Sequence, residues 1–259
     1  MKITITHVST ACVIININGY RILTDPVLDH AGKLYHFGYG TLSRKTEEPA
    51  LQAAELGKID LVLLSHHQHQ DNLDTTGKAF IKTVPLVLTT PPAAKHFTNA
   101  VGLANWQSYR PETSLVPGLI ITATPAQHHP WWLPGFFAGK VIGFMIEWAG
   151  QQNGALYLTG DTVYFKGLEE VARRFTVNTI IVNLGSVQFR YLTGWGRYTF
   201  NAAEAIKTAL LMKAKQVIPI HYRGWTHFKE NEIQPAFNAS PIATKTIWLQ
   251  SGRETEIDC

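Results

Sequence analysis

The sequence predicts an α/β protein in which mixed β-sheets are covered by helices. Short apolar runs of strand length alternate along the chain with segments of helical periodicity. Hydrophobic residues make up 45% of the chain and charged residues 16%, which is enough for a large core. The 259 residues contain no short repeat and no proline- or serine-rich linker, so we expect a single domain over residues 1–259.

The chain is expected to open with a β-hairpin. Residues 3–6 alternate apolar and polar side chains at the strand period of two, and the Asn-Gly pair at 18–19 is a hairpin turn signal. Residues 20–23 are then the return strand. An irregular stretch rich in glycine, histidine and tyrosine follows, and a short helix is expected over residues 49–57.

The remainder alternates between strands and helices. Helices are expected over residues 168–175 and 202–213, and the second begins with Asn201 and Glu204 at the spacing of a capping box. The expected strands are apolar runs at residues 59–64, 86–88, 119–122, 141–148, 155–159, 179–184, 216–220 and 246–249.

Composition argues against several classes of protein. No apolar run approaches the ~18 residues of a membrane span, and the N-terminal stretch has too few charges and too many polar residues for a signal peptide. Two cysteines, Cys12 and Cys259, cannot build a disulfide framework, which favours a reducing, cytoplasmic location. The net charge of +4 comes from scattered lysines and arginines, so a nucleic-acid partner is not expected.

The histidines are unevenly distributed. Seven of the eleven gather at three places, each at or just beyond the C-terminal end of an expected strand. A fourth strand end carries Thr-Gly-Asp-Thr, which includes Asp161. Loops that leave one edge of a sheet bring distant residues together. The seven residues are His66, His67, His69, His128, His129, His221 and His227.

The densest group, residues 66–74, offers three histidines and two aspartates within nine residues. Imidazole suits a borderline-soft metal ion, and carboxylate suits a harder one. Together with His128, Asp161 and His221 at other strand ends, this group predicts a metal centre.

These motifs resemble the metallo-β-lactamase-fold superfamily, and within it the branch that includes ascorbate-6-phosphate lactonase and the N-acyl-phosphatidylethanolamine-hydrolysing phospholipase D. Residues 66–72 approximate the pattern His-x-His-x-Asp-His. The later ligands match His128 in Pro-Ala-Gln-His, Asp161 in Thr-Gly-Asp-Thr and His221 in Pro-Ile-His-Tyr. The Thr-Asp-Pro turn around Asp25 is also similar, and the motifs keep their order along the chain.

The resemblance implies a four-layer αβ/βα sandwich with a two-metal site at one edge. One ion would be held by histidines of the first group and His128, and the other by Asp71 and His221, with Asp161 bridging both. One or two divalent ions, Zn²⁺ or Mn²⁺, would convert a water molecule to the attacking hydroxide. The implied activity is hydrolysis of an ester, lactone or phosphodiester bond.

The chain departs from the pattern in two ways. One extra residue precedes His69, so either His66, which directly follows the strand exit, or His67, which keeps the alternating spacing, is the first ligand. Asn72 stands where the family usually has a histidine. A neutral amide oxygen is a weaker ligand, so the second ion should bind less tightly or be a harder ion such as Mn²⁺.

Three further residues are candidates for supporting roles. Asp25 and Asp74 are candidate carboxylates that orient ligand histidines, and the alternatives are a turn role for Asp25 and a helix start for Asp74. His227 is a candidate proton donor to a substrate oxyanion, which would place it with Asp71 and Asp161 in the catalytic set.

Aromatic and basic residues in three loops suggest a substrate site. Arginine binds phosphate or carboxylate in bidentate fashion, and aromatic rings stack on apolar or sugar faces. The loop over residues 129–137 is especially rich in aromatics. We therefore expect a small substrate with an anionic group and an apolar or ring portion. The candidate contact residues are Arg190, Arg197, Arg223, Trp131, Trp195 and Trp225.

Two alternative functions stay open at this stage. Asn72 favours a metal-binding protein of the same fold with little or no turnover, and the pI near 9.0 favours a nucleic-acid-processing member. The leading expectation is a metal-dependent hydrolase of a small, soluble molecule, with no stable membrane anchor and with homo-oligomer formation left open.

Overall fold

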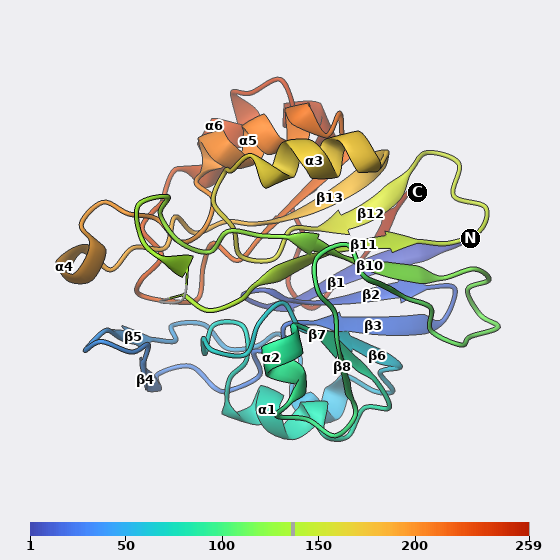
Figure 1. Cartoon of the computed structure of the whole chain (residues 1–259), viewed down its shortest axis with the longest axis horizontal. Helices are drawn as coiled ribbons and strands as arrows, with labels where there is room; N and C mark the ends of the chain where they lie inside the picture. The colour runs from blue at the N-terminus through green and yellow to red at the C-terminus, as the bar shows by residue number, and fades with distance from the viewer. Residues whose placement is uncertain (136–137, 259) are drawn as a thin grey trace.

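Two β-sheets pack face to face, and helices cover both outer faces (Figure 1). The computed structural model describes residues 1–135 and 138–258. Phe136 and Phe137 of the aromatic loop, and Cys259, lie outside the described residues. The layered arrangement confirms the predicted α/β sandwich with mixed sheets.

The first sheet combines an antiparallel half and a parallel half. Its antiparallel half is an N-terminal meander joined by the last strand of the chain, and its parallel half begins where β3 pairs with β6. In spatial order the strands are β15 (Glu254–Ile257), β1 (Ile3–Ser9), β2 (Cys12–Ile17), β3 (Tyr20–Thr24), β6 (Leu61–Leu63), β7 (Val87–Thr89) and β8 (Ala100–Gly102).

The second sheet is mixed in the same way. Its last three strands along the chain run parallel, and the others pair antiparallel. In spatial order the strands are β14 (Gln216–Ile220), β13 (Val177–Asn183), β12 (Ala155–Leu158), β11 (Ile142–Glu147), β10 (Ile120–Pro125) and β9 (Ser108–Tyr109).

Helices form the outer layers, and two smaller elements project from one end of the sandwich (Figure 1). The second sheet is covered by α3 (Gly167–Arg174), α5 (Ala202–Leu211) and α6 (Ile233–Asn238), and the first by α1 (Thr75–Ile81) and α2 (Pro91–Ala94). The projecting elements are the hairpin of β4 (Leu34–His36) and β5 (Leu42–Arg44), and the short helix α4 (Arg190–Thr193).

Strands of the first sheet are buried on both faces. In β2, Val13 and Ile15 enter the core between the sheets, while Cys12 and Ile14 enter the core beneath the outer helices. A strand buried on both faces reads as a continuous apolar run rather than an alternating one. This is why the sequence shows apolar runs, and why those runs locate the central strands well.

Most expected elements are present, with three corrections. The Asn18-Gly19 turn joins β2 to β3, but the opening is a three-stranded meander rather than one hairpin. The helix expected over 49–57 is only a 3₁₀ turn at Ala53–Glu55. The strand expected over 246–249 is wrong, because that segment makes one isolated bridge from Thr246.

The final strand is instead β15, with the sequence Glu-Thr-Glu-Ile. It lies at the edge of the first sheet, where charged side chains face water, so no apolar run marks it. No helix in the described part of the chain has the length and apolar character needed to cross a membrane.

The capping box of α5 provides a test of local stability. Asn201 accepts a hydrogen bond from the backbone amide of Glu204 at 2.8 Å, and the Glu204 carboxylate bonds back to the Asn201 amide. We expect Asn201→Ala to lower the free energy of unfolding by about 1 kcal/mol, because an orphan helix amide loses its acceptor. Urea denaturation measures this, and Asn238→Ala on the exposed surface of α6 is the control, expected to change stability by less than ~0.5 kcal/mol.

Candidate metal centre

The predicted ligands leave the sheets at one shared edge. His66 follows β6, His128 follows β10, Asp161 follows β12 and His221 follows β14. Gly160 allows the segment after β12 to lie close to its neighbours here. It has φ +61°, and a Cβ on it would lie 2.5 Å from the carbonyl oxygen of Ile142 in the adjacent strand and 3.3 Å from Cβ of Ser65, which follows a strand of the other sheet. A side chain at position 160 would therefore push the strand exits apart.

Three histidines form the first cluster of candidate ligands. His69 Nδ1 lies 3.0 Å from both His66 Nε2 and His128 Nε2. Nitrogens that share one Zn²⁺ at 2.0–2.1 Å in a tetrahedron lie about 3.3 Å apart, so the spacing matches a ligand set. His66 and His128 are buried.

The partners of the outer ring nitrogens determine the tautomers. His128 Nδ1 is 2.8 Å from the backbone carbonyl oxygen of Tyr198, which can only accept, so Nδ1 carries the proton. His66 Nδ1 is 2.9 Å from Ser65 Oγ, whose own proton goes to Asp25 Oδ2 at 2.9 Å. Both Nε2 lone pairs therefore point inward at His69, which can offer at most one proton to two acceptors. A cation fits this arrangement.

A second cluster consists of Asp71, Asp161 and His221, all buried. His221 Nδ1 donates to the backbone carbonyl of Leu184 at 3.2 Å, so its Nε2 faces two carboxylates, 3.5 Å from Asp71 Oδ2 and 3.7 Å from Asp161 Oδ2. Asp71 Oδ1, Asp161 Oδ2 and His221 Nε2 have no hydrogen-bond partner among the described residues. Buried acceptors without donors are costly, and a divalent cation would satisfy all three.

The pKa values of the histidines shift in opposite directions in the two clusters. Burial lowers the pKa of His66 and His128, and lowers that of His69 to about 4, so the first cluster is neutral and ready to ligate at pH 7. Burial also opposes a charge on His221, but the carboxylates of Asp161 and Asp71 outweigh it and raise its pKa to about 9. A proton thus compensates the two carboxylates when no metal ion does.

Asp25 contacts the first cluster indirectly, through Ser65. Its carboxylate accepts from the Ser65 amide at 2.7 Å and from Ser65 Oγ, which fixes the hydroxyl that contacts His66. Burial raises the pKa of Asp25 to about 8, although the bonds from Ser65 oppose this. Asn72 Nδ2 donates to Asp25 at 3.3 Å, while its buried Oδ1 has no partner among the described residues. Asn72 therefore borders the centre with its amide oxygen unpaired.

Asn183, at the end of β13, belongs to the site and was missed by sequence reasoning. Its Nδ2 donates to Asp161 Oδ1 at 2.8 Å, which leaves Oδ2 as the free carboxylate oxygen. The available signal was a polar residue ending an apolar strand at the same sheet edge.

His221 and Asp25 adopt left-handed backbone conformations, φ +59° and +30°, which non-glycine residues reach only under strain.

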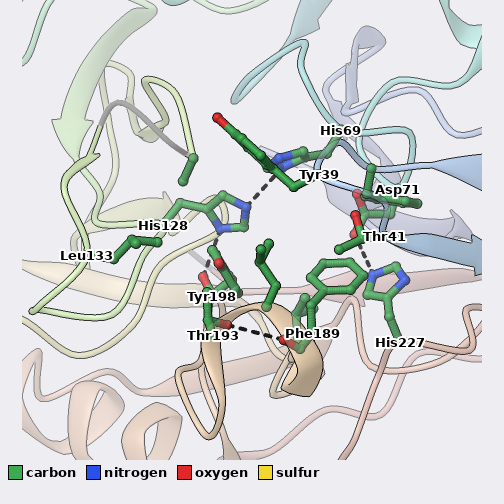
Figure 2. Close-up of a pocket in the computed structure, with 14 residues that line it drawn as sticks. Tyr39, Thr41, His69, Asp71, His128, Leu133, Phe189, Thr193, Tyr198 and His227 are labelled. Atoms are coloured by element: carbon green, nitrogen blue, oxygen red, sulfur yellow. Dashed lines mark hydrogen bonds and ion pairs between the residues drawn. The ribbon is translucent and has the colours of Figure 1, made fainter.

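His227 is also at the centre. Its Nε2 lies 3.0 Å from Asp71 Oδ2 (Figure 2). Its Nδ1 lies 2.5 Å from Ser43 Oγ. Burial opposes ionisation of Asp71, yet the neighbouring rings of His221 and His227 hold its pKa well below the usual range. His227 therefore fixes one oxygen of Asp71 and borders the pocket next to it.

Two candidates lie elsewhere. The His67 ring is half-buried and packs on His96, with centroids 4.6 Å apart, outside both clusters. Of the two residues proposed as the first ligand, the structure brings His66 to the cluster. Asp74 does not orient a histidine, because its carboxylate caps α1 through the Gly77 amide at 2.8 Å and faces the buried Lys45 at 3.9 Å.

A pocket of about 250 Å³ opens onto both clusters (Figure 2). Its floor contains two residues of the first cluster and one of the second, together with His227. Its walls come from the β4–β5 hairpin, the loop after β10 and the segment around α4. The wall residues are Phe37, Tyr39, Thr41, Leu133, Ala138, Val187, Phe189, Leu192, Thr193 and Tyr198, and the floor residues are His69, Asp71, His128 and His227.

The six residues predicted to contact substrate do not line this pocket. Trp131, Trp195 and Arg197 line a neighbouring groove, where Arg197 pairs with Glu204 at 2.5 Å. Arg190 stacks over the Trp195 ring at 4.1 Å.

The other two predicted residues are also held elsewhere. Arg223 Nε lies 3.4 Å from Glu47 on the surface, and Trp225 is buried, donating its indole proton to Thr10 Oγ1. Arg197 and Arg223 lie in loops as predicted, whereas Arg190 begins the short helix α4, and acidic or aromatic neighbours hold all three side chains.

The sandwich fold defines the class of this protein, an α/β sandwich of the metallo-β-lactamase fold, and its two clusters form a candidate metal centre. The chain belongs to the beta-lactamase superfamily, because the model of the beta-lactamase superfamily domain matches residues 20–222. A UPF0173 metal-dependent hydrolase from Methanospirillum hungatei is 27% identical over 203 residues, 76% of this chain and 84% of the relative.

Two solved structures are similar in fold. The isothiocyanate hydrolase from Delia radicum gut bacteria has a TM-score of 0.80 and 19% identity, and the match covers 98% of this chain and 99% of that one. A possible metal-dependent hydrolase from Veillonella parvula has a TM-score of 0.83 and 20% identity, covering 99% and 100%. The narrower resemblance to the lactonase and phospholipase D branch stays a prediction.

Adjacent histidines allow a matched test of the first cluster. We expect His66→Ala to weaken divalent-ion binding by at least ~100-fold, because it removes a ligand nitrogen. His67→Ala should change it by less than ~3-fold. Isothermal titration of chelator-treated protein with Zn²⁺ measures both affinities. Equal losses in the two variants would contradict the assignment of His66.

Proposed function

We propose that this protein hydrolyses an ester, lactone or phosphodiester bond in a small molecule, using one or two Zn²⁺ or Mn²⁺ ions. The observation that supports it most is that a pocket reaches both ligand clusters, through His69 and His128 of the first and through Asp71 of the second, whose buried Oδ1 has no partner among the described residues. A metal site open to a pocket is the arrangement of catalytic rather than purely structural sites. The relatives named metal-dependent hydrolases agree with this reading.

Each cluster is proposed to hold one ion. His66, His69 and His128 would hold the first, and Asp71 and His221 the second. Asp161 is the candidate bridge, because its unpaired Oδ2 lies 3.7 Å from His221 Nε2 of the second cluster and beside the ring of His128 of the first. Divalent ions in such a site supply Lewis acidity and make water acidic enough to ionise near neutral pH.

The chain's own groups contribute orientation and a proton. Asp25 and Ser65 fix the ring of His66, and Asn183 fixes Asp161. We assign His227 as the proton donor to the departing group, since its Nε2 lies at the pocket floor beside Asp71. The apolar walls exclude water from the substrate around this polar floor.

Isothiocyanates are a second candidate substrate class, favoured by the apolar pocket wall. The similar fold from Delia radicum gut bacteria belongs to an isothiocyanate hydrolase. An isothiocyanate is uncharged and has an electrophilic carbon, and its hydrolysis consumes one water and yields an amine and carbonyl sulfide. Benzyl isothiocyanate therefore belongs in the substrate panel used below.

Loss of Asp161 tests the proposed chemistry. We expect Asp161→Ala to lower kcat/KM by at least ~1000-fold on any substrate that the metal-loaded protein turns over, because both ions lose a ligand. Chelation should abolish turnover, and added Zn²⁺ or Mn²⁺ should restore it. The control is Glu169→Ala on the exposed face of α3, expected to keep full activity.

The panel comprises 4-nitrophenyl esters, γ-lactones, bis(4-nitrophenyl) phosphate and benzyl isothiocyanate. Full activity of Asp161→Ala, or turnover that survives chelation, would contradict the proposal. Tight ion binding without turnover on any panel member would favour the metal-binding alternative.

The proposed role of His227 has its own signature. A proton donor matters most when the departing group is a poor one, so we expect His227→Gln to slow an ethyl ester by about 100-fold or more. The matching 4-nitrophenyl ester should be slowed by less than ~10-fold, because nitrophenolate leaves without a proton. Metal content, measured by atomic emission, should stay unchanged. A uniform loss on both esters, or loss of an ion, would assign His227 to positioning Asp71 alone.

A further inference from the structure

The pocket above the metal clusters lacks the cationic side chains that a charged substrate needs. Among the residues that the structure describes, neither lysine nor arginine lines it. Six wall residues are wholly apolar: Phe37, Leu133, Ala138, Val187, Phe189 and Leu192. A second ionised group on the substrate would enter this wall without a partner, and an unpaired buried charge is strongly disfavoured.

The two threonine hydroxyl groups of the wall do not replace the missing cations, and the phenol groups of Tyr39 and Tyr198 are polar but are not cations either. Thr41 Oγ1 donates to the backbone carbonyl of Gly38 at 2.5 Å, and Thr193 Oγ1 donates to the carbonyl of Phe189 at 3.5 Å. With their protons engaged, these hydroxyls face the pocket as acceptors. An anion needs hydrogen-bond donors, whereas an uncharged apolar group needs neither donors nor acceptors.

Arginines near the pocket are held away from it. Arg190 lies over Trp195, and Arg197 is paired with Glu204 in the neighbouring groove. Releasing Arg197 would leave Glu204 without its ion-pair partner. The same carboxylate also accepts the hydrogen bond from the Asn201 amide in the capping box of α5. The ion pair therefore holds the Arg197 guanidinium outside the pocket.

We infer, building on the hydrolase function proposed above, that the site takes uncharged substrates with a compact apolar group on the scissile carbon. Substrates that carry a second, anionic group are excluded. The polar floor handles the reacting bond, and the aromatic and aliphatic wall binds the apolar group. Small aryl or alkyl carboxylic esters and lactones, and apolar isothiocyanates, belong to this class.

A matched pair of substrates tests this inference. 4-Nitrophenyl butanoate and mono(4-nitrophenyl) succinate share a leaving group and are close in size, but only the succinate carries a second, ionised carboxylate. We expect the Zn²⁺-loaded protein to favour the butanoate by at least ~100-fold in kcat/KM. A ratio near one, or a preference for the succinate, would overturn the inference.

A wall variant links the preference to the pocket. Leu192 lines the pocket and is 43% exposed, so an arginine there can be accommodated. We expect Leu192→Arg to shrink the preference by at least ~10-fold, because it supplies the missing cation. Leu210→Arg on α5, at a site 46% exposed, is the control and should leave the ratio unchanged. An equal effect of both variants would contradict the assignment of this wall.

A binding measurement separates the inference from the hydrolase function. N-(4-nitrophenyl)butanamide and N-(4-nitrophenyl)succinamic acid are the corresponding amides, and calorimetry with the Zn²⁺-loaded protein should show the neutral amide binding at least ~30-fold more tightly. Tighter binding of the acid would overturn the inference even without turnover. Metal-dependent turnover with the reverse preference would leave the hydrolase function intact. Preference without metal-dependent turnover would count against that function alone.

Discussion

The structure depends on one constraint: ligand nitrogens with no proton, and with no hydrogen-bond donor able to satisfy both of them, are buried at the edge of the sheets. His66 and His128 have their outer nitrogens occupied by Ser65 and the Tyr198 carbonyl, so each presents a bare nitrogen to the interior. Removing these acceptors from water costs free energy that folding must supply elsewhere. Burial of apolar side chains in the core between the two sheets offsets this cost. Binding of a cation to the bare nitrogens would offset a further part of it.

That cost explains how firmly the surroundings hold each ligand. The ligands leave strands that are buried on both faces, so the strand exits cannot shift without disturbing the core. His221 is held in a strained backbone conformation, and its amide donates to the Thr10 carbonyl of the opposite sheet at 2.9 Å. Strain of this kind persists only where the surrounding structure imposes it. Both sheets therefore define the geometry of the centre.

Sequence reasoning located the centre because strand ends and metal-ligating residues leave local signals. The apolar runs that end near His66, His128, Asp161 and His221 were enough to predict that these strand ends share one edge. The six candidate ligands do lie together there. Side-chain partners have no such signal. Nothing local shows that Asp74 caps α1, that Glu204 holds Arg197, or that Asn183 reaches Asp161 across two neighbouring strands. The expected arginine contacts to an anionic group do not line the pocket for this reason, since its lining depends on which arginines are held elsewhere.

The two clusters are chemically unequal, and Asn72 increases the difference. The first presents three neutral imidazoles, whereas the second presents two carboxylates and one imidazole. Imidazole nitrogens favour Zn²⁺, and carboxylate oxygens accept harder ions, so the second position is the one where the ion can vary. Asn72 directs its amide protons to Asp25 and adds no charge, while His227 approaches Asp71 from the pocket side. In the proposed site, a histidine at the pocket rather than at position 72 would leave the second ion more loosely held and would place the proposed proton donor beside the substrate.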